Sequence, residues 1–471
     1  KVANIIGQSM QYHPHGDASI GDALVNIGQK DLLIDTQGNW GDVRTGDQAA
    51  ASRYIEARLS KFALEVAFNA KTTTWQLSYD GRKNEPVTLP MKFPLLLAQG
   101  ADGIAVGLST KILPHNFCEL IDASIKYLKG KKFELFPDFQ TGGMVDVSGY
   151  NEGKRGGKVR VRAHIEELDK KTLVIKDVPY GVTTTQLMES ITKANDQGKI
   201  KIKKVTDVTA AAVEIHIDLA PGISPDITID ALYAFTDCEV SISPNACVVI
   251  DHKPHFIGVQ ELLKDATDNT KELLRKELDI RLSELEDKWH YTSLEKIFFE
   301  EKIYKELEQK HASWENVIEA IDKAFTPFKK KLKRAIERED ILKLTEKPVR
   351  RIYRLDINEL IEQIRGIEEE IKQVKFDLEH LTEYSVAYFE NLLKKFGKNK
   401  ERKTEIKAFD TIQVKQVAIA NTKLYINRAE GFIGTSLKKD EHLCDCSDYD
   451  DIIAFTKAGT MKVVKVSDKI F

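Results

Sequence analysis

The stretch INELIEQIRGIEEEIKQVKFDLEHL, residues 357–381, decides how the second half of this chain folds. Its apolar residues are spaced 3, 4, 3, 4, 3, 4 and 3 apart, which gives an apolar seam that runs for four heptads. Charged side chains occupy most of the other positions, so the helix has to bury its seam against another helix. The seam consists of Ile357, Leu360, Ile364, Ile367, Ile371, Val374, Leu378 and Leu381.

A second helical stretch, residues 259–289, supplies a candidate partner with a weaker apolar repeat. About 65 residues of helical character separate the two stretches. This pattern predicts an antiparallel coiled-coil arm that carries a small helical knob, and an ordinary helical bundle explains it less well. The weaker repeat comprises Leu274, Leu278, Leu282, Leu285 and Trp289, and the knob includes Phe298, Phe299, Ile303, Ile318, Ile321 and Phe325.

The rest of the chain has mixed or β-type patterns. Residues 1–105 combine helical and short strand patterns, and residues 106–257 change to alternating strands that glycine and proline interrupt. Two later segments, 424–433 and 453–462, resemble each other and predict strand–turn–strand units with glycine at the turn. The chain therefore contains several domains, as its 471 residues also indicate.

Two basic stripes are candidate contacts for a polyanion. In each stripe charged residues alternate with apolar ones, so a strand would place its charges on one face. Such a face either contacts a phosphate backbone or is the solvated side of a half-buried strand. The first stripe is Lys158, Arg160 and Arg162, and the second is Lys199, Lys201 and Lys203.

Composition sets further limits on the class of protein. A net charge of -3 argues against indiscriminate binding of polyanions, and no apolar run approaches the roughly 20 residues of a membrane span. The five cysteines are too scattered for a disulfide framework, and the lone pair Cys444 and Cys446 favours free thiols over zinc. We expect a cytoplasmic protein.

An ordered series of motifs carries the clearest functional signal. An Arg-Tyr pair such as Arg53-Tyr54 occurs by chance in many proteins, but here it stands within a longer series. In content, order and spacing, this series resembles the A subunit of bacterial type IIA topoisomerases, the family of DNA gyrase and topoisomerase IV. The series is YHPHGD at 12–17, DTQGNWG at 35–41, ASRY at 51–54, GADGIAVG at 100–107 and LPHN at 113–116.

The resemblance extends over nearly the whole chain, through RKTEI at 402–406, and implies a multidomain α+β fold. It implies that the chain, which begins with Lys1, is a fragment that lacks an amino-terminal helical arm. The helix expected at residues 16–28 would be the recognition helix of a winged-helix domain. The implied domains are a winged-helix DNA-cleavage domain (1–105), an α/β tower domain (106–257), a coiled-coil arm and dimerisation domain (258–407) with a knob at about 291–354, and the first blade of a carboxyl-terminal β-propeller (408–471).

The implied activity is DNA strand cleavage and rejoining. Tyr54 would attack a backbone phosphorus and form a 5′-phosphotyrosine, and Arg53 would stabilise the charge on the phosphoryl oxygens. His13 and His15 would be the next electrostatic donors and DNA contacts. From the residues alone, this His-x-His pair could instead bind a metal or hold its own loop.

Three more positions follow from the resemblance. Ile104 matches the residue that wedges between base pairs and kinks the DNA, although an isoleucine among glycines and alanines is more often buried in a strand. Ala18 and Asp22 match the drug-contact positions of the family. Because alanine replaces the usual serine, quinolone sensitivity is in doubt, whereas catalysis does not depend on that serine.

The chain has no phosphate-binding loop and no compact acidic cluster that could hold magnesium. We therefore expect no metal site in this chain, and the resemblance implies that a separate B subunit binds Mg²⁺ and ATP. The expected partners are double-stranded DNA, a second copy of this chain and the B subunit, in an A2B2 assembly on the nucleoid, without a membrane.

The subtype follows from a missing motif. Gyrases carry a glutamine-arginine-arginine-glycine-rich box in the first propeller blade, and residues 436–451 contain no counterpart. This favours topoisomerase IV, which unlinks daughter chromosomes and relaxes supercoils, with the A subunit of gyrase as the alternative. A non-catalytic architectural DNA-binding dimer is the hypothesis from another class, but such a protein would not need Arg53, His13, His15 and Ile104 together.

Overall fold

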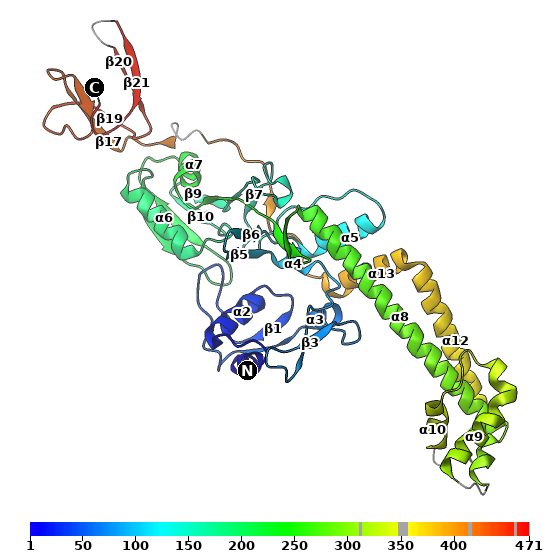
Figure 1. Cartoon of the computed structure of the whole chain (residues 1–471). Coiled ribbons are helices and arrows are strands. Elements are labelled where there is room, and N and C mark those ends of the chain that lie inside the picture. The colour runs from blue at the N-terminus through cyan, green and yellow to red at the C-terminus, as the bar shows by residue number, and fades with distance from the viewer. Residues whose placement is uncertain (310–312, 347–356, 413–416, 456–458, 471) are drawn as a thin grey trace.

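The computed structural model describes residues 1–309, 313–346, 357–412, 417–455 and 459–470 of the chain. It is a mixed α+β protein of elongated shape, with a long helical arm at one end and a small β-unit at the other (Figure 1). The amino-terminal unit lies beside the root of the arm. Within the described residues, none of the helices combines the length and the apolar character that crossing a membrane requires.

The amino-terminal unit has a small core of its own. Val2, Ile6, Trp40 and Ile55 are buried together, between the first two helices and the loop that contains Tyr54. Helix α2 approaches the ring of Trp40 so closely that only a glycine, Gly28, fits at the contact. The elements of this unit are α1 (Val2–Ser9), α2 (Asp17–Gln29), β1 (Ile34–Gln37), β2 (Glu56–Leu59), α3 (Lys61–Val66), β3 (Trp75–Leu77), β4 (Asn84–Pro86) and α4 (Leu95–Gln99).

Next come a hairpin and two four-stranded sheets. The first sheet has the order β11-β12-β10-β9 and the second the order β13-β8-β7-β16, in which β16 pairs in parallel with β7 after the chain has returned from the arm. The elements are β5 (Ala101–Ala105), β6 (Leu108–Ile112), α5 (Phe117–Leu128), β7 (Met144–Asp146), β8 (Val159–Arg162), β9 (Ile165–Asp169), β10 (Thr172–Ile175), α6 (Thr184–Asp196), β11 (Ile202–Asp207), β12 (Ile215–Leu219), α7 (Pro225–Phe235), β13 (Glu239–Ile242), β14 (Cys247–Ile250), β15 (Lys253–Phe256) and β16 (Glu405–Ile406).

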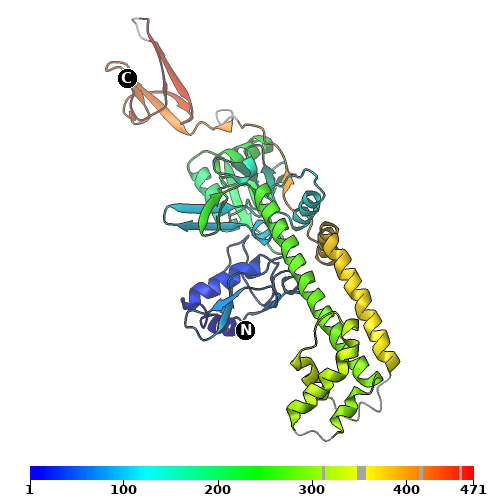
Figure 2. The same cartoon turned by 45° about the vertical axis from the view of Figure 1, so that its right-hand side comes forward.

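The arm consists of two long helices, α8 (Val259–Glu300) and α12 (Ile357–Glu379), that pack along each other (Figure 2). Every residue of the predicted seam is buried or half-buried, which confirms the heptad pattern. The last seam residue, Leu381, however, begins the next helix, α13 (Leu381–Phe396). The prediction of one helix through residue 381 was wrong because His380 leaves the helical conformation, with φ −114° and ψ 42°.

A helical cluster lies at the far end of the arm. Phe298, Ile321 and Phe325 are almost fully buried in its core, as the apolar pattern predicted. Part of the predicted knob, residues 310–312 and 347–354, lies outside the described residues. Besides the end of α8, the cluster contains α9 (Trp314–Phe325), α10 (Arg338–Thr345) and two short 3-10 helices.

The carboxyl-terminal unit contains two antiparallel β-motifs. Strands β17 (Thr422–Asn427), β18 (Phe432–Gly434) and β19 (Glu441–Cys446) form one sheet, and β20 (Asp451–Phe455) pairs with β21 (Met461–Lys465). The two predicted strand–turn–strand units are thus present, although residues 456–458 of the second turn lie outside the described residues.

The close contact at Gly28 yields a stability prediction. A Cβ at this position would lie 2.6 Å from Cζ3 of Trp40, so Gly28→Ala must displace a buried ring. We expect it to destabilise the amino-terminal unit by about 1–3 kcal/mol, measured as a lower midpoint of urea unfolding. Gly7→Ala is the matched control, because a Cβ there has no neighbour within 4 Å and alanine favours the helix. Equal midpoints for the two variants would contradict the packing argument.

Candidate functional site

The loop that contains Tyr54 is fixed on both sides of the tyrosine. The backbone N–H of Ala3 donates to the carbonyl of Ser52 at 3.1 Å, and that of Val2 donates to the carbonyl of Ile55 at 3.1 Å. The side chain of Ile55 is buried beneath the loop, whereas Tyr54 is 63% exposed. The start of helix α1 thus holds the loop while the phenol projects into solvent.

Arg53 lies against the tyrosine ring. Its guanidinium carbon is 4.6 Å from the centroid of the Tyr54 ring, within the range of a cation–π contact. Both side chains are exposed, so the arginine remains accessible to a ligand. The pair therefore presents a hydroxyl and a positive charge side by side, as the attack of a phenol on a phosphodiester requires.

The two histidines lie at the other end of α1. The ring centroids of His13 and His15 are 4.0 Å apart, and the backbone N–H of His13 donates to the carbonyl of Ser9 at 3.0 Å. Both rings are exposed. Helix α1, about 12 Å long, lies between the Tyr54 loop and the segment that carries the two histidines. Their expected role as electrostatic donors and DNA contacts stays a prediction.

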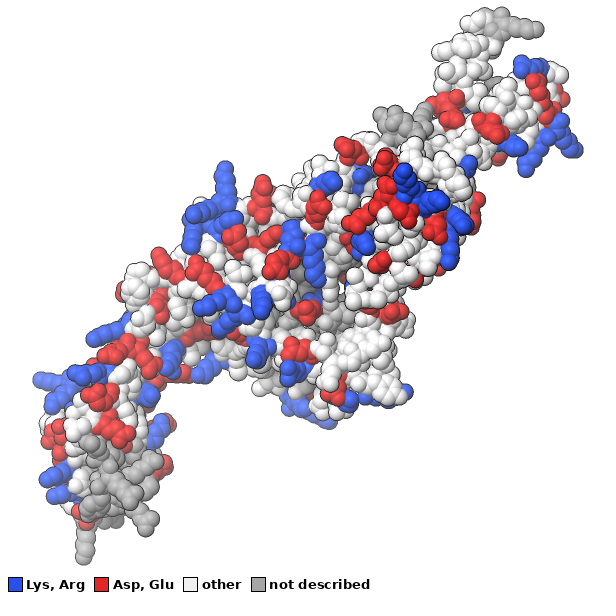
Figure 3. Space-filling model, turned by 180° about the vertical axis from the view of Figure 1, so that it is seen from behind, with Lys and Arg blue, Asp and Glu red and all other residues white. Residues whose placement is uncertain are grey.

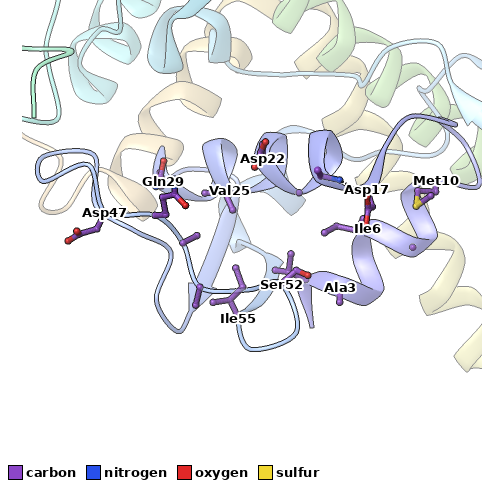
Figure 4. Close-up of a pocket in the computed structure, with 17 residues that line it drawn as sticks. Ala3, Ile6, Met10, Asp17, Asp22, Val25, Gln29, Asp47, Ser52 and Ile55 are labelled. Carbon is purple, nitrogen blue, oxygen red and sulfur yellow. Dashed lines mark hydrogen bonds between the residues drawn. The ribbon is translucent and has the colours of Figure 1, made fainter.

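A groove of about 730 Å³ lies along α1, between this helix, α2 and the loop of residues 47–55 (Figure 4). Ala18 and Asp22 are one turn apart on α2 and both line it. Asp17 and Asp47 add two more carboxylates, and the described residues of the lining include no lysine, arginine or histidine. The groove is therefore suited to apolar or cationic groups and unsuited to phosphate.

Ile104 is on a protruding hairpin formed by β5 and β6. Its side chain is 90% exposed, and Val106 at the turn is completely exposed. The alternative of an isoleucine buried within a strand is therefore excluded. Full burial of such a side chain is worth about 2 kcal/mol, so a ligand that covers this tip gains affinity.

The first basic stripe is largely internal. Arg162 forms an ion pair with Glu239 at 2.5 Å and is only 9% exposed. Arg160 pairs with Asp146 at 2.6 Å, and both guanidinium groups lie over the ring of Phe409. Carboxylates of neighbouring strands thus already pair with these two arginines in the free chain, and their contact with phosphate stays a prediction. Lys158 remains exposed.

The second stripe is only partly a strand. Strand β11 begins at Ile202, so Lys199 and Lys201 precede it, and the Nζ of Lys199 lies 5.9 Å from the ring centroid of Phe235. Lys201 and Lys203 are exposed and remain candidates for phosphate contact. Basic and acidic side chains are interspersed over the face shown in Figure 3.

The LPHN motif, by contrast, is structural. His115 is buried, its Nε2 lies 3.0 Å from the hydroxyl of Tyr150, and burial lowers its pKa to about 4. The side chain of Asn116 caps helix α5 by accepting from the N–H groups of Cys118 and Glu119. In the described part of the chain, no three His, Cys, Asp or Glu side chains are grouped to hold a metal.

Two residues near the hairpin were not predicted from sequence patterns. Val106 is more exposed than Ile104, and the positive φ of Gly107 marks the tight turn that exposes it. Asn245 contacts the hairpin from more than 130 residues away in sequence. The glycine could have indicated the turn, whereas no local pattern identifies Asn245.

Comparison with known proteins places the chain in a family. Residues 1–392 match the family model for the A subunit of DNA gyrase/topoisomerase IV, and residues 423–471 match a topoisomerase C-terminal domain of Bacteroidota. The A subunit of DNA topoisomerase 4 from Borreliella burgdorferi is 41% identical over 471 residues, which are 100% of this chain and 75% of that protein.

The A subunits of gyrases are also similar. That of DNA gyrase from Brachyspira hyodysenteriae is 28% identical over 99% of this chain and 61% of its own length. That of Lawsonia intracellularis is 34% identical over 62% of this chain and 38% of its own length. The matched family model spans most of the chain, and the chain belongs to the family of DNA gyrase and topoisomerase IV A subunits, which are type II DNA topoisomerases.

Proposed function

We propose that this chain cleaves and rejoins DNA with Tyr54 as the nucleophile, as part of an ATP-dependent type II topoisomerase. The observation that carries the proposal is the exposed phenol of Tyr54 with the guanidinium of Arg53 stacked on it, on a loop that helix α1 fixes. A tyrosine with a packing role would instead bury its ring.

The proposed reaction is a reversible transesterification. The phenolic oxygen of Tyr54 forms a bond to a backbone phosphorus as the bond from phosphorus to the 3′ oxygen breaks. The phenol loses its proton, the 3′ oxygen gains one, and the strand ends on a 5′-phosphotyrosine. Arg53 offsets the negative charge that develops on the non-bridging oxygens. Because the phosphodiester energy is conserved, attack by the 3′ hydroxyl reseals the strand.

The exposed hairpin supports a second part of the proposal. Ile104 would enter the base stack and kink the duplex, at an unstacking cost of a few kcal/mol that additional protein contacts offset. His13 and His15 would contact a phosphate away from the cleaved bond. Lys158, Lys201 and Lys203 are the exposed lysines of the two stripes that we propose as backbone contacts.

We assign the domains as a winged-helix cleavage domain (1–105), a tower domain (106–257), a coiled-coil arm with a dimerising knob (258–407) and the start of a β-propeller (408–471). A cytoplasmic, nucleoid-associated A2B2 enzyme follows, in which two copies cut opposite strands. The B subunit would supply Mg²⁺ and ATP, since the described residues of this chain fit no metal site.

Topoisomerase IV is the subtype that the observations favour. The sequence between residues 436 and 451 has no gyrase box, and the relative that is similar over the whole chain at 41% identity is the A subunit of a DNA topoisomerase 4. Gyrase remains the alternative because the A subunits of gyrases are also similar.

The nucleophile can be tested by removing one hydroxyl. Tyr54→Phe, assayed with magnesium and the B subunit, should bind DNA within about twofold of wild type and form no covalent adduct, because the phenyl ring lacks the nucleophilic oxygen. Tyr79→Phe is the matched control, since Tyr79 is also 63% exposed, and it should keep the adduct. An adduct of wild-type yield in Tyr54→Phe would refute the proposal and leave an architectural DNA binder.

The subtype can be tested on linked DNA circles. The full-length protein, with a matching B subunit, magnesium and ATP, should unlink catenated circles without adding negative supercoils, as gel electrophoresis would reveal. Negatively supercoiled products would assign the enzyme to gyrase. Unchanged catenanes with folded subunits would count against both.

The second stripe can be tested through salt dependence. If Lys201 and Lys203 each neutralise one phosphate, their combined replacement by alanine should reduce the slope of log affinity against log salt by about 1.8. Lys170 and Lys171, at the turn between β9 and β10, provide a control pair with the same change in charge. Equal slopes for the two double variants would exclude the stripe as a phosphate track.

A further inference from the structure

The hairpin that carries Ile104 projects from the body of the protein, next to the hairpin of β14 and β15 (Figure 2). Its residues pair with each other, and the Lys111–Asp102 ion pair at 2.9 Å joins only its own two strands. An exposed tip can be held at a defined angle only by contacts that connect the hairpin to the body. Asn245 makes such contacts.

The backbone of Asn245 forms a short bridge with β6. Its N–H donates to the carbonyl of Lys111 at 3.0 Å, and the N–H of Lys111 donates to the carbonyl of Asn245 at 2.9 Å. The next residue, Ala246, is buried, and its N–H donates to the carbonyl of Gly153 at 3.0 Å. The bridge is therefore attached directly to the hydrophobic core that contains Ala246, Val159 and Val161.

The side chain of Asn245 extends this attachment toward the tip. Its Nδ2 donates to the carbonyl of Ser109 at 2.7 Å and lies 3.4 Å from the hydroxyl of the same serine. Ser109 is the residue that pairs directly with Ile104 across the hairpin. One amide group thus contacts the strand opposite the proposed wedge.

We propose that Asn245 is a positioning residue that sets the angle at which Ile104 meets the DNA. This inference rests on the proposed function, in which Ile104 kinks the duplex. The carbonyl oxygen of Ser109 is an acceptor, so the side chain of Asn245 must supply the donor, and its amide N–H does so. An aspartate of nearly the same size would place a carboxylate against that carbonyl and push the hairpin away.

The first test measures the hairpin without DNA. In Asn245→Asp, amide hydrogen exchange at residues 101–112 should be about two- to tenfold faster than in wild type, because one hydrogen bond is lost and a repulsion is added. Asn151→Asp, which makes the same charge change at an exposed residue, should exchange as wild type does. Unchanged exchange in Asn245→Asp would overturn the proposal.

The second test measures bending of a short duplex by energy transfer between its labelled ends, with the full-length chain and its B subunit. The bend in Asn245→Asp should fall toward that of Ile104→Ala, while the unfolding midpoint and the affinity at low salt stay near wild type. Faster exchange with a wild-type bend would overturn the positioning role. If wild type and Ile104→Ala bend DNA equally, the proposal that Ile104 kinks DNA is refuted. Amide hydrogen exchange then decides only whether Asn245 holds the hairpin.

Discussion

A shared aromatic core is the constraint on which the rest of the structure depends. The ring of Phe62, from the amino-terminal unit, packs edge-on against Phe93, Phe117 and Phe396 at centroid distances of 5.1 to 5.4 Å. Phe396 lies at the end of α13, the helix that follows the arm, so this core joins residues that precede the arm to a residue that follows it. A largely buried ion pair between Lys92 and Glu277 of α8, at 2.8 Å, lies across the same junction. If the amino-terminal unit moved away from the root of the arm, aromatic surface would be exposed and this charge pair would separate. Each of these changes costs several kcal/mol, so the two parts move together.

The sequence predicted those parts of the fold whose signal is local. The seam of α12 has a period that its own residues set, and the strand–turn–strand units have glycine at the turn. The sequence could not show contacts whose partner is distant along the chain. The alternation around Arg160 and Arg162 correctly indicated a strand, but it could not reveal that Asp146, Glu239 and Phe409 would surround these arginines. Strand periodicity shows which side chains share a face, and only the neighbouring strands determine whether that face is solvent or a buried ion-pair network.

The residues of the quoted motifs lie in very different environments in the structure. In the LPHN motif, His115 packs inside the core and Asn116 caps a helix, so a motif of this kind preserves the scaffold and does not contact a substrate. His13 and His15 are exposed and follow the end of helix α1, whereas the start of α1 contacts the Tyr54 loop, and the motifs alone could not show this arrangement. Ile104 differs from His115, because its apolar side chain among glycines and alanines favours burial, whereas its position on a hairpin exposes it. Exposure of a large apolar side chain is unfavourable for the free protein, and this makes it a better indicator of function than the motif alone.

The distribution of charge constrains how this chain can hold DNA. Asp17, Asp22 and Asp47 are the charged residues in the described lining of the groove beside the Tyr54 loop. Arg160 and Arg162 are already paired, and acidic and basic residues are interspersed over the face shown in Figure 3. Phosphate neutralisation by the described surface therefore supplies less affinity than a continuous basic track would. In the proposed function, shape supplies the remainder. A duplex that bent around the tip of the β5–β6 hairpin would cover Ile104 and Val106, and this apolar burial would offset part of the unstacking cost. If the proposed function holds, the orientation of the hairpin matters as much as the chemistry proposed at Tyr54, because a duplex that did not bend would leave the apolar tip uncovered.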